Sequence, residues 1–266
     1  MNISIVISAL ALTFIAGAAT AIGSMIAFFA HRTSTRLIST ALGLSAGVMI
    51  YVSFMDLLPE ALRMMTANMA GKGGEVVVAG AFFGGIALIA LIDWLIPQEE
   101  NPHEMHSVEE LASDTSRRNL HRTGMMVAVA IAIHNFPEGV ATFVSALDGL
   151  DVAIPIVVAI AIHNIPEGIA VAVPVYHATG SKNKAFRWSL LAGLAEPLGA
   201  IVAMVVLLPF WSPLLSAILL SAVAGIMVYI SIDELLPSAR EYGHHHLSIA
   251  GFIAGMLLMA LSLLFF

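Results

Sequence analysis

Eight runs of apolar residues take up most of the chain, and each is long enough to cross a bilayer as a helix. Crossing about 30 Å of hydrocarbon takes roughly 20 helical residues. The runs fall near residues 3–30, 37–58, 75–96, 123–147, 152–176, 186–209, 213–236 and 247–266. Because a backbone in lipid must satisfy its own hydrogen bonds, these spans are expected to be helices. We predict an all-α integral membrane protein whose eight transmembrane helices form a single domain over residues 1–266.

The composition fits a chain surrounded by lipid. Hydrophobic residues make up 59% of it and charged residues 11%, with a mean hydropathy of +0.93, whereas soluble domains carry about 25% charged residues. The lipid bilayer is therefore the expected surrounding, and the net charge of -7 argues against a nucleic-acid partner. The absence of Cys excludes disulfides, thiolate metal sites and cysteine nucleophiles.

Lys and Arg are distributed unevenly between the two sides of the membrane. One set of alternate connections carries nine of them: Arg32, Arg36, Arg117, Arg118, Arg122, Lys182, Lys184, Arg187 and Arg240. The other set carries only Arg63 and Lys72. Cytoplasmic loops are enriched in positive charge, so we expect a cell (inner) membrane protein with both termini outside the cytoplasm. A cleaved signal peptide is the alternative for the first run, but no positive charge precedes it and it is longer than an h-region.

A hydrophilic stretch at about residues 97–122 separates the third and fourth spans. It holds acidic residues together with His103, His106 and His121, and is expected to be a mobile cytoplasmic loop. These histidines, and the three at positions 244–246, could bind metal loosely. A solvated tail without a metal role is the alternative for both segments.

Two internal repeats organise the spans. Residues 47–61 match residues 225–239 without a gap at an offset of 178, and the same offset is expected to relate span 1 to span 6 and span 3 to span 8. Each such pair crosses the membrane in opposite directions, which predicts an inverted repeat. A second repeat relates residues 131–139 to 160–168 in consecutive spans. The resulting 3+2+3 inverted-repeat arrangement is typical of secondary transporters; duplication of a purely structural bundle is the alternative.

The second repeat places two copies of His-Asn-x-Pro-Glu-Gly near the bilayer midplane. His134 and Glu138 lie on one helical face, and Asn135 lies about 100° around the helix, so that Glu138 could contact cations on both sides. The second copy supplies His163, Asn164 and Glu167. An unpaired carboxylate at this depth costs of order 3 kcal/mol. Since imidazole and carboxylate together suit zinc and other first-row metals, we predict a divalent cation as their partner.

Prolines accompany these side chains. Pro137 and Pro166 each remove one backbone hydrogen bond, and the carbonyls they release could face the ion path. Glu196, which Pro197 follows, lies at a similar depth in span 6 and is predicted to be a third carboxylate of the same site. A neutral Glu bonded to a backbone carbonyl is the alternative for Glu196.

Acidic residues near the span ends and small residues of span 1 are further candidates for a role in transport or packing. Asp56 lies towards the outside, whereas Asp93, Asp233 and Glu234 lie towards the cytoplasm, where they could pass ions on or simply be solvated. The small residues between positions 17 and 23 allow close helix approach, and we expect them to serve packing.

With these residues the whole chain resembles the Zrt/Irt-like protein (ZIP) family of divalent metal transporters, in particular its short bacterial ZupT-like branch. The resemblance rests on the eight spans, the His-bearing loop and the motifs at residues 134–139 and 163–168. It implies uptake of zinc, and also of iron(II), manganese and cadmium, into the cytoplasm through a binuclear site. The metal is then a bound substrate, with no separate cofactor and no enzymatic activity expected.

The resemblance also implies how the site is divided. One subsite would consist of His134, Glu138, His163 and Glu167, and the other of Asn135, Glu138, Asn164, Glu167 and Glu196. The family further suggests an elevator-like motion of spans 1, 4, 5 and 6 against spans 2, 3, 7 and 8, and a possible homodimer. The rival class is an intramembrane di-metal enzyme, because His and Glu on facing helices also form di-iron sites in bundles. Such an enzyme requires neither the prolines in both motifs nor the inverted repeats.

Overall fold

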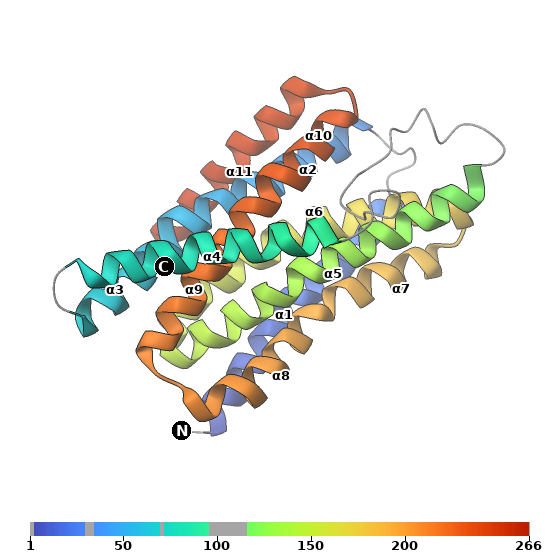
Figure 1. Ribbon diagram of the computed structural model, residues 1–266. Helices are drawn as coiled ribbons and strands as arrows, with labels where there is room; N and C mark the ends of the chain where they lie inside the picture. Colours follow the sequence, from blue (N-terminus) through green and yellow to red (C-terminus); the bar gives the residue numbers. More distant parts are fainter. Residues whose placement is uncertain (1–2, 30–34, 70–71, 96–115, 266) are drawn as a thin grey trace.

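The computed structural model describes residues 3–29, 35–69, 72–95 and 116–265. Within these ranges the chain is helical and contains no strand, so the predicted all-α class is confirmed. The helices are α1 (Ile3–Phe29), α2 (Thr35–Val52), α3 (Leu58–Asn68), α4 (Gly73–Leu95), α5 (Ser116–Asp148), α6 (Leu150–Thr179), α7 (Lys182–Gly193), α8 (Ala195–Leu207), α9 (Pro213–Ile230), α10 (Leu236–Glu241) and α11 (His245–Phe265) (Figure 1). Shorter segments join some of them: η1 (Ser53–Leu57), η4 (Leu208–Phe210) and η5 (Ser231–Leu235).

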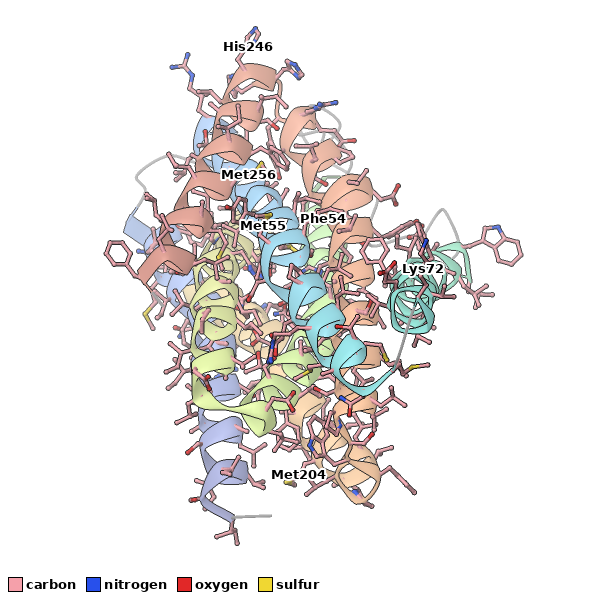
Figure 2. All side chains as sticks on the ribbon, turned by 90° about the vertical axis from the view of Figure 1, so that its left-hand side faces the viewer. Phe54, Met55, Lys72, Met204, His246 and Met256 are labelled. Atoms are coloured by element: carbon pink, nitrogen blue, oxygen red, sulfur yellow. The ribbon has the colours of Figure 1, made fainter. Side chains whose placement is uncertain are left out.

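Long apolar helices dominate the described chain. Seven of them meet the length and hydropathy expected of membrane spans, and α5, with 33 residues, is a further long helix. The chain is therefore a multi-pass membrane protein. Figure 2 shows His246 and Met204 at opposite ends of the bundle. The first turns of α5 occupy residues 116–122, which were predicted to be loop; residues 96–115 lie outside the described ranges.

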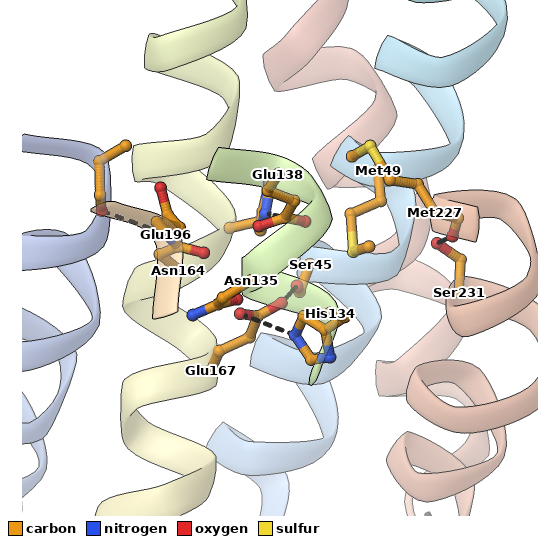
Figure 3. Close-up of polar contacts among 12 residues, drawn as sticks. Ser45, Met49, His134, Asn135, Glu138, Asn164, Glu167, Glu196, Met227 and Ser231 are labelled. Atoms are coloured by element: carbon orange, nitrogen blue, oxygen red, sulfur yellow. Dashed lines mark hydrogen bonds and ion pairs between the residues drawn. The ribbon is translucent and has the colours of Figure 1, made fainter. Parts of the chain in front are cut away.

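Spans 2 and 7 each contain one π-helical turn, at equivalent places. Segments η1 and η5 begin at Ser53 and Ser231, which are 178 positions apart. The Ser53 hydroxyl donates to the carbonyl of Met49 at 2.7 Å. The Ser231 hydroxyl donates to the carbonyl of Met227, also at 2.7 Å (Figure 3). A proline in the first turn of α3 and of α10 follows each segment, where its missing N–H costs little.

Spans 2 and 7 both continue as helix beyond their π-helical turns, and therefore end later than hydropathy predicts. Span 2 continues through α3 to Asn68 and span 7 through α10 to Glu241, beyond the predicted ends at residues 58 and 236. In α3 the apolar run ends because Glu60 and Arg63 are exposed or half-buried, while the opposite face of the helix stays buried. Hydropathy averages both faces and misses such an amphipathic extension.

Two pairs of helices pack at close range through glycines. At each of four glycines, an added Cβ would come within about 2.0–2.1 Å of a carbonyl oxygen of the neighbouring helix: Gly47 at Phe252, Gly255 at Leu44, Gly225 at Phe82 and Gly85 at Ala222. The α2–α11 and α9–α4 contacts thus use corresponding positions. Corresponding residues of α4 and α11, such as Gly85 and Gly255, are however 170 positions apart rather than the predicted 178. The offset is smaller because α10, which precedes α11, is shorter than α3, which precedes α4.

The helices form two groups. Helices α1, α5, α6, α7 and α8 pack mainly against one another, and the second group consists of α2, α3, α4, α9, α10 and α11. The principal contacts between the groups are made by α2 with α6 and by α5 with α9. The helix pair that carries both His-Asn-x-Pro-Glu-Gly motifs is therefore the part of the first group that faces the second.

Candidate metal site between α5 and α6

The two motifs lie in the middle of consecutive antiparallel helices. Helix α5 ends at Asp148, Gly149 makes the turn with a φ of 149°, and α6 begins at Leu150. Only glycine adopts such a φ without strain, so the turn can be this short. All seven predicted site residues are buried, with exposed fractions of 2% or less: His134, Asn135, Glu138, His163, Asn164, Glu167 and Glu196.

Each imidazole contacts the glutamate of the other helix. His134 Nε2 lies 3.2 Å from Glu167 Oε2, and His163 Nε2 lies 3.0 Å from Glu138 Oε1; Figure 3 shows the first pair. The two contacts are reciprocal, since both helices contribute one His and one Glu. The structure therefore brings these four residues, expected from the resemblance to form one subsite, into direct contact across the helix pair.

The two asparagines reach outward to the helices that flank the pair. Asn164 Nδ2 donates to the carbonyl of Ala16 at 3.0 Å and to Glu196 Oε1, and Asn135 Nδ2 donates to the carbonyl of Ala192 at 3.3 Å. These bonds fix the amide nitrogens on α1, α7 and α8. The amide oxygens, which are the atoms a cation would bind, are left without hydrogen-bond partners among the described residues.

Glu196 lies in the first turn of α8, directly after the interruption at Leu194 that separates α7 from α8. Its side chain accepts the amide hydrogen bond of Asn164, as Figure 3 shows. The structure thus brings Glu196 to the motif residues, and its partner is an amide donor rather than the backbone carbonyl of the alternative. The glycine of the first motif explains the close approach, because a Cβ on Gly139 would lie 1.9 Å from the Glu196 carbonyl oxygen.

One contact of the site was missed from the sequence. Ser45 on α2 donates from Oγ to Glu167 Oε1 at 3.2 Å (Figure 3), and its side chain is fully buried. The residue at the equivalent repeat position is Val223. A polar residue in one repeat opposite an apolar residue in the other was the signal that could have identified Ser45.

Several buried polar atoms of this layer have no hydrogen-bond partner within the described ranges. They include His134 Nδ1, Asn135 Oδ1, Glu138 Oε2, His163 Nδ1, Asn164 Oδ1 and Glu196 Oε2. Buried polar atoms are nearly always bonded, and residues 123–176 contain no Lys or Arg that could balance the carboxylates. Nitrogen and oxygen donors of this kind suit a divalent transition metal.

The donors are engaged in pairs rather than gathered around one point. In the described part of the chain, no group of three or more His, Asp or Glu side chains is already arranged to hold a metal ion. Binding a cation to this layer therefore requires the two imidazole–carboxylate contacts to open.

Of the four acids predicted at span ends, only Asp93 lies near one. Asp56 lies in η1 and Asp233 and Glu234 lie in η5, inside the extended spans 2 and 7, so their predicted placement at the span ends was wrong. Asp93 accepts a hydrogen bond from the Tyr229 hydroxyl at 3.5 Å, and Asp233 follows Tyr229 by one turn and is exposed. The neighbouring Glu234 is buried, because successive helical residues point in different directions. Asp56 is half-buried, and its Oδ2 has no hydrogen-bond partner among the described residues.

The histidines outside the motifs do not form one cluster in the described chain. His244 Nε2 lies 3.0 Å from the Thr35 hydroxyl, and the rings of His245 and His246 are 5.5 Å apart. His103 and His106 lie outside the described residues.

Comparison with known proteins agrees with this architecture. The family described as ZIP zinc transporter matches residues 2–263. A protein of Streptococcus mutans named "Zinc transporter ZupT" is 58% identical over 259 residues, 97% of each chain. Proteins of the same name from Clostridium perfringens and Corynebacterium aurimucosum are 54% and 51% identical, covering 100% of this chain and 98% and 100% of theirs.

Fold and site together define a multi-pass helical membrane protein with a buried layer of imidazoles, amides and carboxylates. The match over nearly the whole length adds the family: the chain belongs to the ZIP zinc transporters.

Proposed function

We propose that this protein carries divalent transition-metal cations, zinc first among them, across the cell membrane into the cytoplasm. The observation that carries the proposal is the pair of reciprocal His–Glu contacts, 3.2 and 3.0 Å long, buried between two antiparallel helices without a compensating Lys or Arg. A bound cation would offset the cost of burying three carboxylates at this depth. The names of the relatives support zinc as the ion.

The layer can hold two ions, with Glu138 and Glu167 between them. Glu138 Oε1 contacts His163 and its Oε2 has no hydrogen-bond partner among the described residues, while Glu167 uses one oxygen for His134 and the other for Ser45. When the imidazole contacts open, each carboxylate can bridge the two ions through its two oxygens. The asparagine oxygens and Glu196 then supply the second ion's ligands, whereas the histidines supply those of the first.

Transport requires the layer to face each side of the membrane in turn. The division into two helix groups, joined mainly by α2–α6 and α5–α9, supports a motion of α1, α5, α6, α7 and α8 against the rest. The corresponding glycine contacts of α2 with α11 and of α9 with α4 support the 3+2+3 inverted-repeat arrangement on which such alternating access rests. A fixed di-metal enzyme has no need of this symmetry, and the named relatives are transporters.

Uptake by the purified protein in proteoliposomes tests the proposal. We expect saturable accumulation of zinc inside the vesicles, with inhibition by cadmium, manganese and iron(II), while an imposed pH gradient reports any coupling to protons. Liposomes without protein are the control. Accumulation no faster than in those liposomes would contradict transport.

A further inference from the structure

Helices α1 and α7–α8 flank the α5–α6 pair in corresponding ways. The asparagine amides donate to corresponding carbonyls, Asn164 to that of Ala16 and Asn135 to that of Ala192. Glycines of the flanking helices pack against corresponding motif residues, Gly23 against Ile165 and Gly199 against Phe136. The motif glycines in turn pack against corresponding flanking residues, Gly168 against Thr20 and Gly139 against Glu196. Between the two sides the flanking residues differ by 176 positions, rather than the 178 predicted for spans 1 and 6, and the motif residues differ by 29. Three pairs of contacts are thus related by the same two residue offsets.

This relation makes Thr20 the counterpart of Glu196. A Cβ on Gly168 would lie 1.8 Å from the Thr20 carbonyl oxygen, just as one on Gly139 would lie 1.9 Å from that of Glu196. The Glu196 side chain meets Asn164. The corresponding partner for the Thr20 side chain is therefore Asn135, the other amide of the site.

The hydroxyl of Thr20 does not make the bond that a buried helical threonine usually makes. Thr13, on the same helix, donates to the carbonyl of Ala9 at 2.8 Å, in the i to i−4 pattern common for helical threonines. The carbonyl that Thr20 would use, that of Ala16, accepts from Asn164 instead. Thr20 Oγ1 is fully buried and has no hydrogen-bond partner within the described ranges.

The unbonded hydroxyl lies next to the site. Thr20 Oγ1 is 3.1 Å from the position that a Cβ would take on Gly193, whose neighbour Ala192 holds the amide of Asn135. The amide oxygen of Asn135 is buried and likewise has no partner among the described residues. Both unbonded atoms thus border the Ala192–Gly193 segment. A buried polar atom without a hydrogen bond carries a free-energy cost, which a hydrated cation bound beside both atoms would remove.

We propose that Thr20 is a further ion-binding residue, which holds a water ligand of the transported cation beside the Asn135 oxygen that binds the same cation. The proposal rests on the transport function above. Because a threonine side chain is shorter than that of a glutamate, Thr20 contacts the ion through its water where Glu196 can contact it directly. The half of the site formed by Asn164 and Glu196 then carries a negative charge, whereas the half formed by Asn135 and Thr20 is neutral. The cation is therefore held closer to Asn164 and Glu196 than to Asn135.

The test compares three substitutions. Thr20→Val removes the hydroxyl and keeps the shape of the side chain, whereas Thr20→Ser keeps the hydroxyl and removes the methyl group. Thr13→Val is the matched control, because Thr13 is a buried threonine of α1 that bonds within its own helix. The readouts are the zinc dependence of uptake into proteoliposomes and zinc binding to the detergent-solubilised protein by calorimetry.

We expect Thr20→Val to raise the apparent KM and the dissociation constant for zinc about tenfold, the effect of one lost hydrogen bond to an ion-bound group. The maximal rate should stay within about twofold, and Thr20→Ser and Thr13→Val should match the parent. Should Thr20→Val fail to fold, Thr20→Ala gives the same comparison.

A Thr20→Val protein whose zinc affinity equals that of Thr13→Val would overturn the proposal while leaving transport intact. A parent that binds zinc but does not accumulate it would instead contradict the proposed function, and the calorimetric comparison would still decide the role of Thr20.

Discussion

Ser45 on α2 and Glu167 on α6 are joined by a hydrogen bond of 3.2 Å between Oγ and Oε1, and this bond connects the two helix groups at the level of the site. The carboxylate that accepts it also contacts His134. If the groups slide past one another during transport, the bond must break, so the serine stabilises the conformation described here.

Replacement of Ser45 tests this role. We expect Ser45→Ala to raise the maximal rate of zinc uptake about fivefold, because a buried hydrogen bond of about 1 kcal/mol no longer holds this conformation. Ser53→Ala is the control, since the Ser53 hydroxyl bonds within its own helix. A maximal rate in Ser45→Ala at or below that of Ser53→Ala would show that the bond is not broken in the limiting step.

The glycine contacts between α4 and α9 give a prediction about stability. A Cβ on Gly85 would lie 2.0 Å from the carbonyl oxygen of Ala222, whereas a Cβ on the adjacent Gly84 meets nothing within 4 Å. We expect Gly85→Ala to lower the thermal midpoint in detergent by about 3 °C or more, because the helices must separate. Gly84→Ala should leave the midpoint unchanged or raise it slightly, since alanine favours the helix. Equal midpoints for the two variants would argue against this helix contact.

The predicted topology can be tested with single cysteines, because the chain has none of its own. Lys72 lies in the exposed turn before α4, and Lys182 is exposed at the start of α7. In intact cells we expect Lys72→Cys to react with a membrane-impermeant maleimide and Lys182→Cys to react only after the cells are opened. The unmodified chain is the blank. Labelling of Lys182→Cys in intact cells would reverse the assigned orientation.

The acids outside the α5–α6 layer, at positions 56, 93, 233 and 234, should differ in their effects on uptake kinetics. We expect Asp56→Asn to weaken the apparent affinity for external zinc, on the prediction that Asp56 gathers ions at the outer mouth. Removal of Asp93, Asp233 and Glu234 together should lower the maximal rate and leave that affinity nearly unchanged, on the prediction that these groups receive the leaving ion.

Uptake over a zinc series distinguishes the two effects. Glu60→Gln serves as the control for Asp56→Asn, because Glu60 is already paired with Arg63 at 2.5 Å. If the triple variant lost only affinity and Asp56→Asn lost only rate, the assignment of Asp56 to the outer mouth and of the other three acids to the cytoplasmic mouth would be wrong.

The sequence predicted the membrane spans well because burial in lipid imposes an apolar run of fixed length. It could not predict the π-helical turns at Ser53 and Ser231, since a change of hydrogen-bond register leaves no trace in hydropathy. The extension of span 2 to Asn68 was missed for a related reason: α3 is amphipathic.

In the candidate site, helical spacing predicts that His134 and Glu138 share one face, and the structure buries the predicted residues. Spacing within a helix says nothing about which neighbouring helix a face meets. The pairing of His134 with Glu167, and the contribution of Ser45 from α2, are tertiary relations and could be seen only in the folded chain. Thr20, assigned from the sequence to packing alone, is another such case.

The most direct test of the central claim is the initial rate of zinc uptake into proteoliposomes by the parent, Glu138→Ala and Glu167→Ala, with Asn135→Ala and Asn164→Ala measured alongside. Because each glutamate would serve two ions, we predict that either glutamate variant loses nearly all uptake, at least about a hundredfold, while the asparagine variants still transport and mainly change which metal is preferred. Uptake by Glu138→Ala and Glu167→Ala at the parent's rate would contradict the account, because the ion would then cross the membrane without the carboxylates between α5 and α6.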